Sequence, residues 1–109
     1  MSEKLDVTIA WPSGDSMPVL ATKLTLEALG QRCPLLIFRD RDDLDWFTGA
    51  VVRSTPSGPV LIMRHDNNPY ELTAFYVDSA QSLDVAHSVI VKLFNLSVGE
   101  VAWRAGEST

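Results

Sequence analysis

The sequence is poor in the residues from which small proteins build disulfides and metal sites. Cys33 is the only cysteine among 109 residues, so no intramolecular disulfide can form. A zinc site takes three or four Cys, His or carboxylate ligands, often in closely spaced pairs. His65 and His87 are the only histidines, and they stand far apart. We therefore expect no metal and no cofactor, and we interpret Cys33 as a buried, unreactive thiol.

Basic residues and long apolar runs are scarce as well. Nine Lys and Arg against fourteen Asp and Glu give a formal net charge of −5. A nucleic-acid-binding domain usually carries a basic stripe, so we expect no nucleic-acid partner, whereas an acidic surface attracts a basic protein. No apolar stretch approaches the roughly 20 residues that span a bilayer, and the segment after Met1 alternates instead of forming a signal region. We expect a bacterial cytoplasmic protein that binds no membrane.

The glycine-rich and nucleophile motifs of common enzymes are missing too. No Gly-x-Ser-x-Gly, Gly-x-Gly-x-x-Gly or Walker loop occurs. His65 and Asp66 fall at the end of a predicted strand, where adjacent side chains point to opposite faces. Asp66 is therefore badly placed to orient His65 as a general base. The sequence predicts no catalytic residue and favours a protein that is not an enzyme.

What the sequence does contain is the composition of one packed domain. Hydrophobic residues make up 46% of the chain and charged residues 21%, which is close to the averages of globular proteins. We predict a single α+β domain over residues 1–109, with loose termini at 1–4 and 105–109.

The first quarter of the chain predicts a strand and then a helix. Residues 5–11 alternate between apolar and polar side chains, as a half-buried strand does. Residues 17–29 have helical apolar spacing, with a cap at Ser16 and a stop at Gly30, and this favours a helix. Alternation over residues 20–26 leaves a strand open as the alternative.

The rest of the chain predicts an antiparallel meander, a helix and a last strand. Short turns separate four β-rich segments, at residues 35–39, 46–53, 59–64 and 70–77, and Gly49 is interpreted as a bulge. Ser82 caps a helix at 83–95, and residues 98–103 form a short strand. The helix stripe is predicted from Val85, Val89, Lys92 and Leu96, widened by Ala86, Ile90, Leu93 and Phe94. The order is β-α-β-β-β-β-α-β, which predicts a mostly antiparallel sheet with both helices packed on one face.

A charged turn beside an aromatic pair is the first candidate site. Its members are Asp40, Asp42, Asp43, Asp45 and Trp46. A calcium loop would need Gly at its sixth position and Glu at its twelfth, and the sequence has neither. On a strand, one residue of the pair at 46–47 must face away from the core. An exposed Trp rimmed by carboxylates is typical of a protein-binding hot spot, although a helix or a dimer partner covering that face remains open.

A second candidate site consists of His65, Tyr70 and Tyr76. These side chains combine apolar bodies with polar tips, as the lining of a small-ligand pocket does. We expect such a pocket between the sheet and the helices or at a homodimer interface.

Four segments of the C-terminal half carry a resemblance to a known class of proteins. They are the run PVLIMR at 59–64, the run ELTAFY at 71–76, the helix that begins at Ser82, and the closing GEVAW at 99–103. Residues 59–103 resemble small bacterial immunity proteins of polymorphic toxin systems, which are α+β proteins that bind and neutralise toxins. The resemblance implies a non-enzymatic protein-binding module that inhibits a basic toxin, and it transfers no site residue. A small-ligand domain or small enzyme stays open as the alternative.

Overall fold

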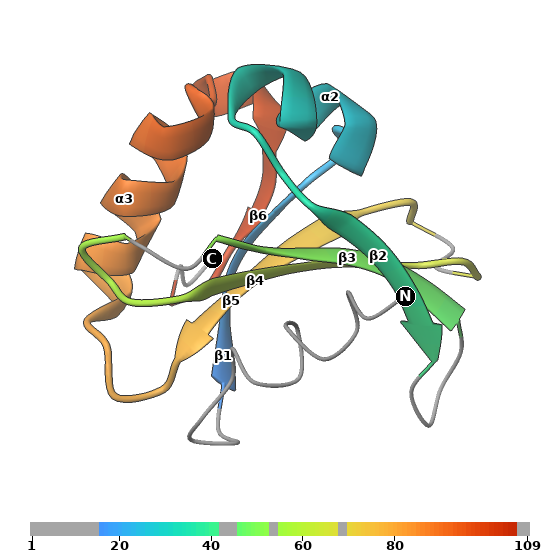
Figure 1. Cartoon of the computed structure of the whole chain (residues 1–109). Helices are drawn as coiled ribbons and strands as arrows, with labels where there is room; N and C mark the ends of the chain where they lie inside the picture. The colour runs from blue at the N-terminus through green and yellow to red at the C-terminus, as the bar shows by residue number, and fades with distance from the viewer. Residues whose placement is uncertain (1–15, 42–45, 53–54, 68–69, 107–109) are drawn as a thin grey trace.

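Six strands form one antiparallel sheet in the computed structural model, which describes residues 16–41, 46–52, 55–67 and 70–106 (Figure 1). The strand order across the sheet is β2-β3-β4-β5-β1-β6. Along the chain the elements are β1 (Ser16–Thr22), α2 (Leu26–Arg32), β2 (Ile37–Arg41), β3 (Trp46–Val52), β4 (Val60–His65), β5 (Thr73–Asp78), α3 (Leu83–Phe94), the 3-10 turn η1 (Val98–Glu100) and β6 (Val101–Arg104). This confirms the predicted α+β class and the order β-α-β-β-β-β-α-β.

The first strand of the sheet is not where the sequence favoured it. The predicted helix at 17–29 is wrong over its first part, because β1 occupies Ser16–Thr22 and pairs with β5 on one side and β6 on the other. The alternative prediction, a strand, is correct for this part, because pairing with β5 and β6 outweighs a weak intrinsic preference for helix. Pro18 borders a register shift, where its missing N–H is tolerated. The strand predicted at 5–11 lies outside the described residues.

The first helix is shorter and begins later than predicted. Its cap is Thr25, whose side chain accepts a hydrogen bond from the Ala28 N–H at 3.2 Å, and Ser16 lies in β1 instead. Gly30 lies inside α2, and the Cys33 N–H closes the helix on the Leu29 carbonyl. At this helix end Cys33 is only half-buried, so the expected burial of its thiol is incomplete.

The predicted meander of β2, β3, β4 and β5 is confirmed, but the predicted bulge is not. Gly49 pairs in register with Phe38 on one side and Met63 on the other, without a shift. A Cβ at Gly49 would lie 2.7 Å from Cζ of Phe38. Glycine is therefore required because the Phe38 ring lies across this position.

Both helices pack on the same face of the sheet and enclose the core (Figure 1). Leu26 and Leu29 anchor α2, and the rings of Phe75 and Phe94 join β5 to α3 at 5.4 Å between centroids. The N-terminal cap of α3 is as predicted, because the Ser82 side chain accepts from the Val85 N–H, and the left-handed Asn95 ends the helix after Phe94.

The stripe with which α3 faces the core differs from the predicted one. The buried residues are Ala86, Ile90 and Phe94, four apart, while Val85 is 51% exposed. The predicted widening of the stripe to Ala86, Ile90 and Phe94 is therefore confirmed, whereas the exposed Val85 does not belong to the core-facing stripe. Within the part of the chain that the structure describes, no helix is both long and apolar enough to cross a membrane.

Candidate functional site

The sheet face that points away from α2 and α3, called here the outer face, carries a row of paired residues across all six strands. The row is Phe38, Gly49, Met63, Ala74, Ala21 and Trp103, each in register with the next. Three of its four inner members are Gly or Ala, while its ends are aromatic. The Phe38 ring covers Gly49, whereas Ala74 and Ala21 leave the outer face hollowed between Met63 and Trp103.

This hollow, called here the outer-face hollow, has a volume of about 530 Å³. Its lining residues are Pro18, Ala21, Met63, His65, Tyr70, Leu72, Ala74, Tyr76, Ala102 and Trp103. The structure therefore brings together all three members of the second predicted set, His65, Tyr70 and Tyr76. They lie on the outer face and not between the sheet and the helices, while the alternative position at a homodimer interface stays a prediction.

The lining of the outer-face hollow is aromatic and apolar, with a few polar tips. The His65 ring lies against Phe47 with 5.7 Å between centroids, and Phe47 in turn meets Phe38 edge-on at 5.8 Å. Tyr70 is 75% exposed and Trp103 is 45% exposed, so they form an open rim. The arrangement offers a wide apolar surface with imidazole and phenol groups that can exchange hydrogen bonds.

Asp66, one residue past His65 at the end of β4, forms an ion pair with Arg39. Arg39 donates to both carboxylate oxygens of Asp66, at 2.9 and 2.8 Å. This hydrogen-bonded guanidinium lowers the pKa of Asp66 below its ordinary value. The ion pair lies on the helix side of the sheet, since Arg39 also donates to Thr48 at 3.1 Å. The carboxylate is therefore held by Arg39 through two hydrogen bonds.

Of the first predicted set, around the charged turn, the structure describes only Asp40 and Trp46. Trp46 pairs with Arg41 and Asp40 pairs with Phe47, so Asp40 and Trp46 lie on opposite faces of the sheet. Trp46 is 45% exposed, and the Arg39 guanidinium lies 5.8 Å from the centre of its ring. Its described charged neighbours are thus cationic as well as anionic. Asp42, Asp43 and Asp45 lie outside the described residues.

The acidity of the chain is concentrated in the segments that the structure leaves undescribed. The described residues carry as many Lys and Arg as Asp and Glu, so the net charge of −5 comes from the other segments. Three of those carboxylates are in the connection between β2 and β3. Among the described residues, no three His, Cys, Asp or Glu side chains form a group able to hold a metal ion.

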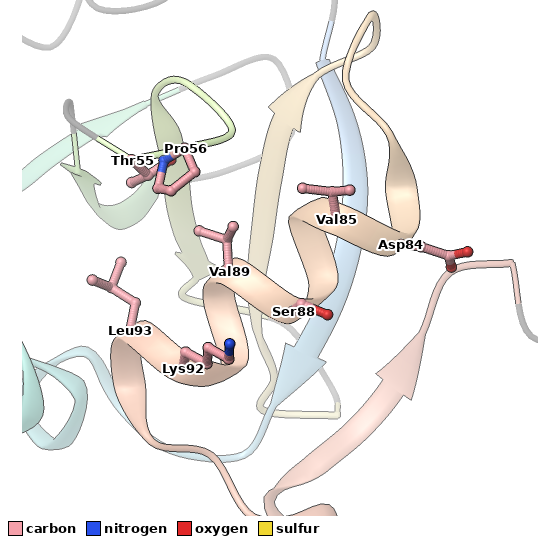
Figure 2. A pocket seen from close by; sticks show the side chains of 8 residues that line it. All are labelled: Thr55, Pro56, Asp84, Val85, Ser88, Val89, Lys92 and Leu93. Atoms are coloured by element: carbon pink, nitrogen blue, oxygen red, sulfur yellow. The ribbon is translucent and has the colours of Figure 1, made fainter.

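A second hollow, made of residues outside both predicted sets, runs along α3 beside the turn at residues 55–58 (Figure 2). Its volume is about 580 Å³. The lining residues are Thr55, Pro56, Asp84, Val85, Ser88, Val89, Lys92 and Leu93. The signal for it was present in the sequence, since a helix with apolar residues on more than one stripe has more apolar surface than one core contact covers.

Comparison with known proteins gives no relative: no family model, no curated protein and no solved structure matches the chain.

Proposed function

We propose that this chain is a non-enzymatic binding module that docks a protein partner on its outer face. The observation that carries the proposal is the outer-face hollow, a trough of small residues between aromatic side chains. Trp, Tyr and Met are enriched where protein interfaces are fully buried, and Trp and Tyr dominate the energetics of such contacts. Met63, Tyr70 and Trp103 supply these residue types here.

The openness of the rim favours a protein over a small molecule. Ligand pockets bury most of the surface of a drug-sized ligand. Tyr70 and Trp103 are 75% and 45% exposed, so a small molecule in the trough would keep much of its own surface in water. A protein that places one apolar or aromatic side chain over Ala74 would cover both the trough and its rim.

The charge of the chain favours a basic partner. The net charge is −5, and its excess lies in the segments that flank the described strands. Opposite charge accelerates association more than it strengthens the final contact. A toxin neutralised by an immunity-type inhibitor is the narrower form of this proposal. Its support is that residues 59–103, which carry the resemblance, supply every lining residue of the outer-face hollow except Pro18 and Ala21.

The test uses two tryptophans of equal exposure. The full chain captures proteins from its native host, and the affinity of the captured protein is then measured with purified components. We expect Trp103→Ala to weaken binding about 30-fold or more, as a hot-spot truncation does, because the residue lines the hollow. Trp46→Ala, on the other face, is the matched control and retains the affinity. If only Trp46→Ala weakens binding, the interface is the charged turn and the proposal is wrong.

A small-ligand domain is a second candidate because His65, Tyr70 and Tyr76 line one hollow of about 530 Å³. That volume is within the range of small-molecule sites, roughly 300–1,000 Å³. Screening a fragment library by the fluorescence of Trp103 in a variant with phenylalanine at the other two tryptophans tests it. Saturable quenching that His65→Ala and Tyr76→Phe both weaken would favour this candidate over protein docking.

A further inference from the structure

We propose that α3 carries a homodimer interface, in which the groove beside α3 receives α3 of a second copy in antiparallel orientation. This inference is independent of the proposed function, because α3 and the outer-face hollow lie on opposite faces of the sheet. The groove is the one lined by α3 and the turn at residues 55–58 (Figure 2).

The apolar surface of α3 exceeds what its own fold uses. Ala86, Ile90 and Phe94 are fully buried against the sheet. Val85 and Val89 lie on a second stripe that borders the groove, and Val85 is 51% exposed. A surface helix of a globular domain usually has one apolar stripe, so a second stripe indicates a second packing partner.

The far wall of the groove is a hydrogen-bonded turn. The Gly58 N–H donates to the Thr55 carbonyl at 2.9 Å, and the Ser57 N–H donates to the Thr55 hydroxyl at 3.1 Å. Gly58 has a φ of +75°, a conformation that glycine adopts without strain. This turn presents Pro56 to the groove opposite Val89 (Figure 2). The groove is therefore a preformed apolar channel with a helix on one side.

The charges on α3 identify a second copy as the occupant. Asp84 in the first turn and Lys92 in the last turn both line the groove. The Asp84 carboxylate lies 3.8 Å from the Arg104 guanidinium, yet its side chain is 93% exposed and open to a second contact. They are separated by about 12 Å of helix, at about 1.5 Å per residue. A helix packed against α3 is complementary in charge when it places a cation opposite Asp84 and an anion opposite Lys92. α3 itself satisfies this condition, because Asp84 would then face Lys92 of the partner subunit at both ends.

The middle of the helix permits the close approach that this pairing requires. Ser88 lies halfway between Asp84 and Lys92 and is exposed, so a two-fold axis there brings two small side chains together. Val85 and Val89 of each copy then pack beside the axis. Exposed ion pairs contribute little free energy. The valines therefore supply the affinity, and the charged ends set the antiparallel orientation.

The oligomeric state of the full chain tests the inference. Sedimentation velocity and light scattering over a range of concentrations should give a mass that rises from 12.0 kDa toward twice that value. Val85→Lys should raise the dimer dissociation constant at least about tenfold. Val98→Lys is the matched control, because Val98 is 94% exposed and lies outside the groove. A wild-type chain that stays monomeric at every concentration overturns the proposal.

Charge reversal separates a second copy from any other occupant. Asp84→Lys and Lys92→Asp should each weaken the dimer, while the double variant restores it, since the two charges again face each other across the axis. Thermal melts of all variants confirm that each remains folded. If both single variants dissociate the dimer and the double variant does not recover it, the antiparallel pairing is wrong. If Trp103→Ala dissociates the dimer and Val85→Lys does not, the interface lies on the outer face and the inference fails.

Discussion

Trp46 and Trp103 are each 45% exposed, yet they lie on opposite faces of the same sheet. Trp46 precedes Phe47, whose register partner His65 lines the outer-face hollow, so Trp46 points to the helix side. Trp103 pairs with Ala21 and stands at the rim of that hollow. Each face of the sheet therefore offers one equally exposed tryptophan to a partner, and the two tryptophans differ in the residues around them. Arg39 and Asp66 accompany Trp46, whereas tyrosines and small residues accompany Trp103.

Filling the trough should block the partner without unfolding the chain. Ala74→Leu adds bulk at the middle of the outer-face hollow, where Ala74 is half-exposed. We expect the free energy of unfolding to change by no more than about 0.5 kcal/mol, as for surface substitutions, and the affinity for the captured partner to fall at least about tenfold. Urea denaturation and calorimetric titration measure the two quantities. Ala80→Leu, in the exposed turn after β5, is the control. If Ala74→Leu and Ala80→Leu bind the partner with equal affinity, the trough is not part of the interface.

Gly49→Ala should destabilise the fold because of Phe38. The new Cβ would lie 2.7 Å from Cζ of the Phe38 ring and 3.0 Å from the Ile62 carbonyl oxygen. Since Phe38 is only 7% exposed, its ring has little room to move. We expect a loss of about 1–3 kcal/mol in the free energy of unfolding, as for overpacked cores.

The control is to measure Gly49→Ala a second time in a chain that already carries Phe38→Leu, in which the side chain packed over Gly49 is shorter. In this background the alanine substitution should cost clearly less in urea denaturation. Equal costs in the two backgrounds would mean that the loss arises from the strand backbone and not from the ring.

The contact between Arg32 and Glu100 should make stability depend on pH in acid. Two hydrogen bonds of 2.8 Å join the side chains, and the Ser97 N–H donates to Glu100 as well. They lower the pKa of Glu100 from 4.5 to about 2. Above pH 4.5 the contact makes its full contribution to the free energy of unfolding. As the pH falls from 4.5 to 2, Glu100 takes up a proton in the unfolded chain before it does so in the folded chain, and this contribution is lost.

Glu100→Gln should therefore flatten the dependence of the melting temperature on pH between 4.5 and 2. Arg32→Gln should flatten it as well, and the double variant should add no further flattening. Arg32 also donates to the carbonyls of Phe94 and Asn95 at the end of α3. Its replacement is expected to lower the melting temperature at every pH. If the melting temperature of Glu100→Gln depends on pH as steeply as that of the wild type, the Arg32–Glu100 contact is not the cause of the acid dependence.

The sequence predicted the fold class and the meander because strand alternation and turn residues are local signals. It favoured the wrong structure at 17–22, where pairing of β1 with β5 and β6 decides, and those partners lie more than 50 residues away. It also predicted too broad an apolar stripe on α3, because the exposed Val85 has the same apolar character as the buried Ala86, Ile90 and Phe94.

The candidate sites show the same limit. His65, Tyr70 and Tyr76 were chosen for their chemistry, and the structure gathers them in one hollow. Trp103 was missed, because its neighbour Ala21 belongs to the strand that the sequence favoured as a helix. The trough itself lies over the small residues Ala21 of β1 and Ala74 of β5. Its existence depends on a register that single-strand patterns do not reveal.

Hydroxyl-radical footprinting of the complex tests the central claim most directly. The oxidation rates of Met63, Tyr70, Trp46 and Trp103 are compared in the free chain and with the captured partner bound. The outer-face proposal predicts protection of Met63, Tyr70 and Trp103, with Trp46 oxidised at its free rate. Protection of Trp46 with an unchanged rate at Trp103 would contradict it and place the partner at the charged turn.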